Sequence, residues 1–260
     1  MRWARTHAGF GRIDGDAIVL VDGAPWGEPR ETGAILALDG ERLLPPTIPS
    51  TFFCAGLNYF GHIEHAFEAG YKQAARPTRA EVGYRANNAL IGHEEDIVKP
   101  YDFDGARFEC EPELVAVFGR TPGRRCSPAE AEASIFGWTI GNDVSAREWQ
   151  NADRTFWRSK NSDTFKPMGP WIETELDLGV AETVTTVDGD ECARFRTGDM
   201  VFSPVDFIVE MSRYITIAPG DVLWLGADAM VQMEPGNVVE IDISGVGTLR
   251  NRIVLEEAYQ

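Results

Sequence analysis

The sequence predicts a mainly β protein of the α+β class, and three observations carry that prediction. Short apolar stretches bounded by Gly, Pro and Asp recur along the chain, a pattern typical of strands joined by turns. Only two segments show clear helix signals, and strands and helices do not alternate, so a doubly wound parallel sheet is not expected. With 260 residues, 43% of them hydrophobic, the chain can bury a substantial core in one or two domains.

The first 48 residues are expected to form a small β domain. Asp-Gly pairs at residues 14–15, 22–23 and 39–40 mark turns between apolar stretches such as residues 17–21. The proline-rich stretch at residues 43–49 favours extended backbone and indicates a linker. The predicted domains therefore span residues 1–48 and 49–260.

The larger domain is expected to contain many strands and two helices. Apolar and small residues at helical spacing between Ile63 and Gly70 predict an amphipathic helix over residues 59 to about 71. Ser127 followed by Pro128 predicts a second helix, because serine is a good N-cap and proline suits the first helical position. Strands are expected at residues 51–57, 114–118, 136–140, 169–172, 201–202, 222–225, 238–243 and 253–255.

Charge and composition exclude several classes of function. Lys and Arg number 24 against 41 Asp and Glu, a net charge of −17 that repels nucleic acids and anionic lipid surfaces. The N-terminus lacks the apolar core of a signal peptide, and no apolar run is long enough to span a membrane. The four cysteines are widely spaced and are interpreted as reduced thiols. A cytoplasmic protein that binds neither nucleic acid nor membrane is expected.

Three glutamates at alternate positions suggest a metal site. Glu109, Glu111 and Glu113 precede an apolar strand, and side chains at i, i+2 and i+4 of a strand project from one face. Crowded carboxylates repel one another unless a cation neutralises them, and an oxygen-only ligand set suits Mg²⁺ or Mn²⁺. The competing interpretation is a solvated strand face in an acidic protein.

Two further segments carry polar groups close to predicted strands. Asp143 follows the strand at residues 136–140 and could complete a carboxylate set, while Arg147 and Gln150 would share a helical face and could grip a substrate carboxylate. Taken alone, this segment favours a turn with an Asp cap followed by a surface helix, because such caps are common. Lys160 could stabilise an oxyanion or enolate beside a metal, or be an ordinary solvated lysine.

Taken together, these segments resemble the fumarylacetoacetate hydrolase family. The family motifs are Gly-Leu-Asn-Tyr-x-x-His, Glu-x-Glu-Leu before an apolar strand, Asn-Asp-Val-Ser-Ala-Arg-x-x-Gln, and Lys-x-x-Asp-Thr-Phe-x-Pro-x-Gly-Pro-Trp. They match residues 56–62, 111–119, 142–150 and 160–171, in that order. The resemblance extends over most of the chain and implies a mixed β-sandwich or roll as the catalytic domain, and a homodimer.

The resemblance also implies the metal centre. It assigns Glu111, Glu113 and Asp143 as ligands of Mg²⁺ or Mn²⁺, with Ca²⁺ as a further option, and leaves Glu109 outside the ligand set. Two oxygens of a 2,4-diketo acid would chelate the ion, which would act as a Lewis acid on the carbonyl.

The remaining residues receive substrate roles by the same resemblance. His62 matches the histidine that activates water, on a helix that resembles a lid. Lys160 matches a catalytic position that polarises the attacked carbonyl. The substrate-binding positions match Arg85, Arg147, Gln150 and Thr164.

Three departures from the family pattern concern the substrate pocket. His65 stands where many members have a glutamate that orients the histidine, and Ala227-Asp228 replaces a Thr-Pro pair whose threonine anchors a carboxylate. Asp228 would repel an anionic tail or act as an extra base. Arg85 stands roughly where the family has a lysine, and the two are not interchangeable.

The expected activity is hydrolysis of a carbon–carbon bond in an acylpyruvate-type keto acid from aromatic or sugar-acid breakdown. The alternative is an isomerase, tautomerase or decarboxylase acting on a hydroxymuconate-type or oxaloacetate-type acid. The missing glutamate partner of His62 favours this alternative. A non-catalytic binding domain is a third hypothesis, and the intact set of polar residues argues against it.

Overall fold

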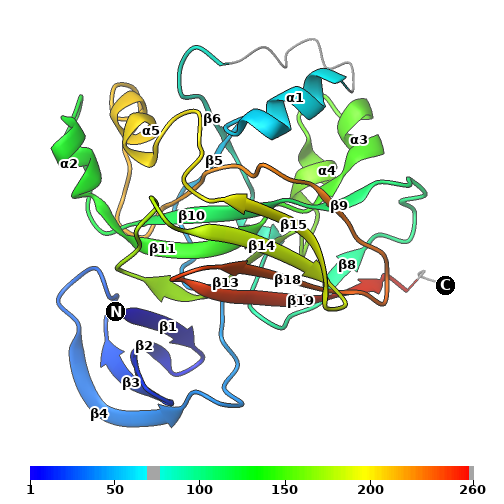
Figure 1. Cartoon of the computed structure of the whole chain (residues 1–260). Coiled ribbons are helices and arrows are strands. Elements are labelled where there is room, and N and C mark those ends of the chain that lie inside the picture. Colours follow the sequence, from blue (N-terminus) through cyan, green and yellow to red (C-terminus); the bar gives the residue numbers. More distant parts are fainter. Residues whose placement is uncertain (69–76, 258–260) are drawn as a thin grey trace.

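The computed structural model describes residues 1–68 and 77–257, and these residues form a mainly β protein, as predicted (Figure 1). Most paired strands run antiparallel, which confirms that a doubly wound parallel sheet is absent from this part of the chain. In Figure 1 strands β1–β4 lie at the bottom of the view and the helices lie at the top.

The largest sheet has eleven strands and includes the N-terminal unit. Its order is β4 (Arg30–Ala37), β3 (Ala17–Asp22), β2 (Gly9–Asp14), β1 (Arg2–Thr6), β13 (Lys166–Glu173), β11 (Ile135–Asn142), β10 (Pro112–Phe118), β16 (Val222–Trp224), β5 (Phe52–Ala55) and β6 (Val82–Tyr84), with β7 (Leu90–Ile91) paired to β13. Strand β1 pairs antiparallel with β13, so the sheet of the N-terminal unit continues into the rest of the protein.

Two smaller sheets complete the β structure. One has the order β12 (Ser145–Ala146), β9 (Phe108–Cys110) and β17 (Val231–Gln232). The other has the order β15 (Asp190–Arg196), β14 (Glu182–Val187), β18 (Val238–Ile243), β19 (Gly247–Leu255) and β8 (Ile97–Lys99). The largest buried apolar cluster includes side chains from all three sheets, such as Leu114, Phe108 and Ile241.

The described residues contain five α-helices and one 3₁₀ turn. They are α1 (Phe60–Glu68), α2 (Pro128–Glu132), α3 (Arg147–Ala152), α4 (Trp157–Asn161), α5 (Pro204–Met211) and η1 (Asn87–Ala89). The first two correspond to the predicted helices, and residues 69–71 of the first prediction lie outside the described residues. None of the described helices has both the length and the apolar character needed to cross a membrane.

The strand predicted at residues 201–202 is wrong, because these residues form a bend that leads into α5. Ser203 accepts a hydrogen bond from the backbone of Asp206, which in turn accepts one from Ser203, and Pro204 fills the first turn. This capping box sets the start of α5. The apolar pair Val201-Phe202 therefore belongs to the approach to a helix.

Gly141 in β11 makes room for the largest side chain of the core. A Cβ atom at this position would lie 2.5–2.7 Å from three ring carbons of Trp224, which is fully buried and packs on Phe52. We expect Gly141→Ala to lower the free energy of unfolding by about 1–3 kcal/mol, the usual cost of overpacking a core. Urea denaturation measures this loss, and unchanged stability would show that Trp224 has space to move.

Candidate metal centre and active site

The acidic segment is split between two sheets at Glu111. Strand β9 ends at Cys110 and β10 begins at Pro112, so Glu111 lies at the point where the chain changes sheets. The prediction that three glutamates project from one strand face is therefore wrong for Glu109. Its carboxylate instead accepts a 2.6 Å hydrogen bond from Arg147 Nε.

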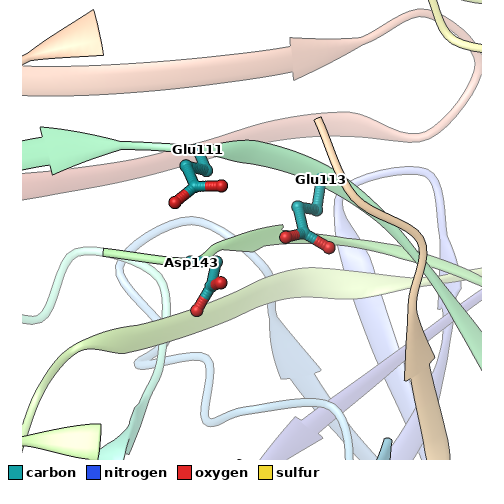
Figure 2. A group of neighbouring side chains, drawn as sticks. All are labelled: Glu111, Glu113 and Asp143. Atoms are coloured by element: carbon teal, nitrogen blue, oxygen red, sulfur yellow. The ribbon is translucent and has the colours of Figure 1, made fainter. Parts of the chain in front are cut away.

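The pairing of β10 with β11 brings Asp143 to the remaining two glutamates. Pro112 lies opposite Asn142, and the backbone N–H of Asp143 donates to the Glu111 carbonyl at 3.0 Å. One carboxylate oxygen from each of Glu111, Glu113 and Asp143 lies within 4.8 Å of the others, and all three residues are buried. Figure 2 shows the three acidic side chains gathered in one place, from two neighbouring segments of the chain.

Asp143 is surrounded by positive charge. Arg85 contacts both of its oxygens, from Nε to Oδ1 at 3.1 Å and from Nη2 to Oδ2 at 2.8 Å. Lys160 Nζ lies 2.8 Å from Oδ2, and Lys166 Nζ lies 2.7 Å from Oδ1. Despite burial, these three cations hold the pKa of the Asp143 carboxyl well below its usual value.

The two glutamates have different surroundings. Glu111 Oε1 accepts from Lys160 Nζ at 2.5 Å and from Ser145 Oγ at 2.6 Å, and Arg147 Nη2 lies 2.8 Å away. Against the effect of burial, Arg147 and Lys160 hold the pKa of Glu111 below its usual range. Glu113 accepts a hydrogen bond from the Gly226 backbone at 2.7 Å, and no Lys or Arg among residues 1–68 and 77–257 forms an ion pair with it.

The charge state of Glu113 indicates that the three acids fit a divalent cation. Burial, reinforced by the nearby Asp143 and Glu111 carboxylates, raises the pKa of Glu113 to about 8. A buried, ionised carboxylate with two acidic neighbours and no ion pair raises the free energy of the folded protein, unless a cation lies among the three groups. Three convergent carboxylates form an oxygen-only set of the kind that hard ions such as Mg²⁺ and Mn²⁺ prefer.

His62 is oriented by a backbone carbonyl. Its Nδ1 lies 3.0 Å from the Ala227 oxygen and 4.0 Å from Glu111 Oε2, so Nδ1–H donates to the carbonyl and Nε2 remains available as a base. Burial lowers the pKa of His62, which is therefore neutral near pH 7. The Ala227 carbonyl thus orients this ring. The side chain of His65 lies outside the part of the chain that the structure describes.

Asp228 fixes the start of the helix that carries His62. Its Oδ1 accepts a 2.8 Å hydrogen bond from the Gly61 backbone in the first turn of α1. The structure thus gives Asp228 a helix-capping contact that neither sequence-based role included. A Cβ on Gly61 would lie 2.7 Å from the same oxygen, so glycine allows this close approach.

We expect Asp228→Ala to weaken the first turn of α1 by about 1 kcal/mol, the usual cost of losing a capping acceptor. Amide hydrogen exchange at Gly61 and Ile63 should then be faster by about fivefold. Asp228→Asn keeps an acceptor oxygen and is the matched control, with exchange close to the unmodified protein. Equal protection in all three proteins would contradict the capping role.

A cavity of about 510 Å³ opens beside the three acids. Its lining includes most of the residues singled out from the sequence, namely His62, Arg85, Glu111, Glu113, Asp143, Arg147, Gln150 and Lys160. Cys54 also lines it, but burial raises the pKa of this thiol to about 11, so it is no nucleophile at neutral pH. Gln150 Oε1 accepts a 2.9 Å hydrogen bond from Arg147 Nη1.

The structure does not bring Thr164 to the cavity. Its Oγ1 accepts a 2.8 Å hydrogen bond from the Val98 backbone, and Thr164 is absent from the cavity lining. The backbone of Thr164 has a φ of 70°, in the left-handed region. These observations place the residue at a turn just before β13.

Sequence reasoning missed two groups at the site. Lys166, fully buried against Asp143, occupies a variable position of the fourth motif and follows the turn at Thr164. The Ala227 carbonyl is a backbone group, so no side-chain pattern could have indicated it. Lys166 is followed by the small and apolar residues 167–170 at the start of β13, and this apolar run was the available signal for a buried lysine.

Comparisons with known proteins find matches over most of the chain. Residues 51–254 match the domain described as fumarylacetoacetate (FAA) hydrolase C-terminal, and residues 1–46 match a domain described as Rv2993c-like, N-terminal. Protein Rv2993c of Mycobacterium tuberculosis is 38% identical over 237 residues, which cover 88% of this chain and 85% of that protein.

Two further relatives carry names that describe an activity. Oxaloacetate tautomerase YisK of Bacillus subtilis is 30% identical over 237 residues, 86% of this chain and 76% of that protein. The crystal structure of 5-carboxymethyl-2-hydroxymuconate delta-isomerase from Mycobacterium smegmatis is 32% identical, covers 98% of this chain and all of that chain, and has a TM-score of 0.85.

Proposed function

Because the chain belongs to the fumarylacetoacetate hydrolase family, we propose that it is a divalent-metal enzyme that moves a proton on a 2-oxo dicarboxylic acid. The reaction is an isomerisation or tautomerisation, which was the alternative to carbon–carbon hydrolysis in the sequence analysis. The observation that carries the proposal is the position of His62, which lines the cavity, has its pKa lowered by burial, and donates from Nδ1–H to the Ala227 carbonyl, so that Nε2 is the unprotonated nitrogen of the neutral ring. The names of the tautomerase and isomerase relatives support the same choice.

One base is sufficient for this chemistry. In a tautomerisation, a proton leaves one carbon or oxygen atom of the substrate and returns to another. His62 Nε2 can accept this proton and deliver it. Hydrolysis additionally requires a water molecule to be activated while the departing carbon receives a proton. Among the residues that the structure describes, the carboxylate that contacts His62 is that of Glu111, whose Oε2 lies 4.0 Å from Nδ1.

Glu111, Glu113 and Asp143 would hold the ion, preferably Mg²⁺ or Mn²⁺. The bound ion would supply Lewis-acid stabilisation of negative charge on the substrate oxygens. Lys160 and Arg85 stand at the same edge of the cavity and are suited to bind the carboxylate end of the substrate. The burial of these groups excludes water and strengthens each interaction.

Carbon–carbon hydrolysis of an acylpyruvate remains the second candidate, and the shape of the cavity favours it. The volume of about 510 Å³ and the apolar side chains of Val82, Phe156 and Met230 can accommodate an acyl tail. Such a tail is absent from a four-carbon dicarboxylic acid.

The products of the reaction distinguish the two candidate functions. Purified protein with Mg²⁺ or Mn²⁺ is incubated in turn with oxaloacetate, a hydroxymuconate-type acid and acetylpyruvate, and the products are followed by NMR. We expect faster interconversion of enol and keto forms, with no carbon–carbon bond broken. Release of pyruvate and an acid from acetylpyruvate would instead establish the hydrolase, and CO₂ would establish a decarboxylase.

A further inference from the structure

The largely buried acidic and basic side chains around the three acids are equal in number, so their charges balance when Glu113 is ionised. Four acidic side chains, those of Glu109, Glu111, Glu113 and Asp143, lie among four basic ones, those of Arg85, Arg147, Lys160 and Lys166. A divalent cation added to this group leaves two positive charges without counterions in a buried site. A ligand that carries two negative charges restores the balance.

Both oxygens of the Asp143 carboxylate are in contact with basic groups. A carboxylate offers about four lone-pair directions, two on each oxygen. Arg85 Nε donates to Oδ1, Arg85 Nη2 and Lys160 Nζ donate to Oδ2, and Lys166 Nζ forms an ion pair with Oδ1 at 2.7 Å. A metal ion that takes Asp143 as a ligand therefore competes with these basic groups for the carboxylate oxygens.

Arg85 is the donor that can leave most easily. Lys166 is fully buried and also donates to the carbonyls of Phe165 at 2.8 Å and Val144 at 3.2 Å, so its position is fixed. Lys160 bridges Asp143 and Glu111. Arg85 lines the cavity, its side chain is 13% exposed, and its planar fork matches a ligand carboxylate as well as it matches Asp143.

We propose that Arg85 competes with the metal ion for the oxygens of Asp143 and moves from Asp143 to the carboxylate of the substrate when both ligands bind. The divalent ion and a dianionic ligand then bind cooperatively. This inference rests on the metal site of the proposed function. It does not depend on which reaction follows. Arg85 is thereby a specificity-determining residue. A ligand with a single negative charge neutralises only one of the two positive charges that the metal ion adds to the buried site.

The test measures metal affinity and needs no turnover. Protein stripped of metal with chelator is titrated with Mn²⁺, and free Mn²⁺ is followed by electron paramagnetic resonance, with and without saturating oxalate. We expect oxalate to tighten Mn²⁺ binding by at least about tenfold, within the usual range of coupling between two sites. The ion must tighten oxalate binding by the same factor.

Arg85→Gln distinguishes this coupling from simple chelation of the ion by oxalate. We expect the variant to bind Mn²⁺ alone about tenfold more tightly, and to retain less than a threefold effect of oxalate. Arg85→Lys keeps the charge but loses the two-point contact, so its Mn²⁺ affinity should be intermediate. Arg107→Gln removes a positive charge from the same cavity and is the matched control, because Arg107 pairs with Glu148, and its Mn²⁺ affinity should stay within about twofold.

Three results would overturn the inference. They are Mn²⁺ affinity that oxalate leaves unchanged in the unmodified protein, an Arg85→Gln variant that binds Mn²⁺ alone no more tightly, or an equal gain in Arg107→Gln. Should Arg85→Gln fail to fold, Arg85→Lys and the unmodified protein still decide the matter. Absence of any Mn²⁺ binding would contradict the metal site itself, which is a separate failure of the proposed function.

Discussion

Replacing Glu113 with glutamine is expected to weaken Mn²⁺ binding by at least about 100-fold without unfolding the protein, since loss of even an outer partner of a metal site costs about 10–100-fold. Glutamine keeps the acceptor for the Gly226 N–H and removes only the charge. Because the folded-state pKa of Glu113 is raised to about 8, the stability linked to its proton is present below the unfolded pKa and is lost as pH rises through 8. With chelator at pH 9, the variant should therefore unfold at a higher temperature than the unmodified protein.

Asp143→Asn is the contrasting variant, because it removes the partner of three buried cations. Loss of one side of a buried ion pair costs about 3–5 kcal/mol, so this variant should lose both metal binding and stability. Calorimetric titration and thermal unfolding of the two variants measure both quantities. If Glu113→Gln bound Mn²⁺ normally, or destabilised the protein as much as Asp143→Asn, the assignment of Glu113 as an unpaired metal ligand would be wrong.

Local sequence signals predicted most of the strands and the first two helices, and could have predicted more. Ser203 and Pro204, with Asp206 three residues after the serine, form the same capping signal that identified the helix after Ser127. The apolar pair before them was interpreted as a strand, although two residues are too few to distinguish a strand from the approach to a helix. The capping signal was present in the sequence, but the apolar pair before it was given more weight, and the predicted strand was wrong for this reason.

The metal ligands were predicted from the motif resemblance more than from the spacing of the acidic residues. An alternation of three glutamates cannot reveal that the chain changes sheets at Glu111, because that change depends on partners far along the chain. For the same reason, Glu109 turned out to face Arg147. The pairing of β1 with β13 spans about 170 residues and has no local signal either.

The orientation of His62 was the least predictable part of the site. The departure at Ala227 suggested the loss of a side-chain hydrogen bond, whereas the structure shows the Ala227 backbone carbonyl holding the histidine. The same loop donates the Gly226 N–H to Glu113 and places Asp228 at the start of α1. One short loop therefore connects the metal ligands, the base and the helix that carries the base.

Replacing His62 with asparagine is expected to lower turnover of the accepted keto acid by about 100- to 10,000-fold, the usual contribution of a general base. Asparagine can still donate a hydrogen bond to the Ala227 carbonyl but cannot accept a proton, so Mn²⁺ affinity should stay within about threefold. The smaller variant His62→Ala should recover part of its activity when imidazole is added, because the cavity then admits a free base. His93 is a matched control, since it is also partly buried and accepts a hydrogen bond from the Arg250 backbone outside the cavity. His93→Asn should retain turnover within about twofold, whereas full activity in His62→Asn would exclude His62 as the base.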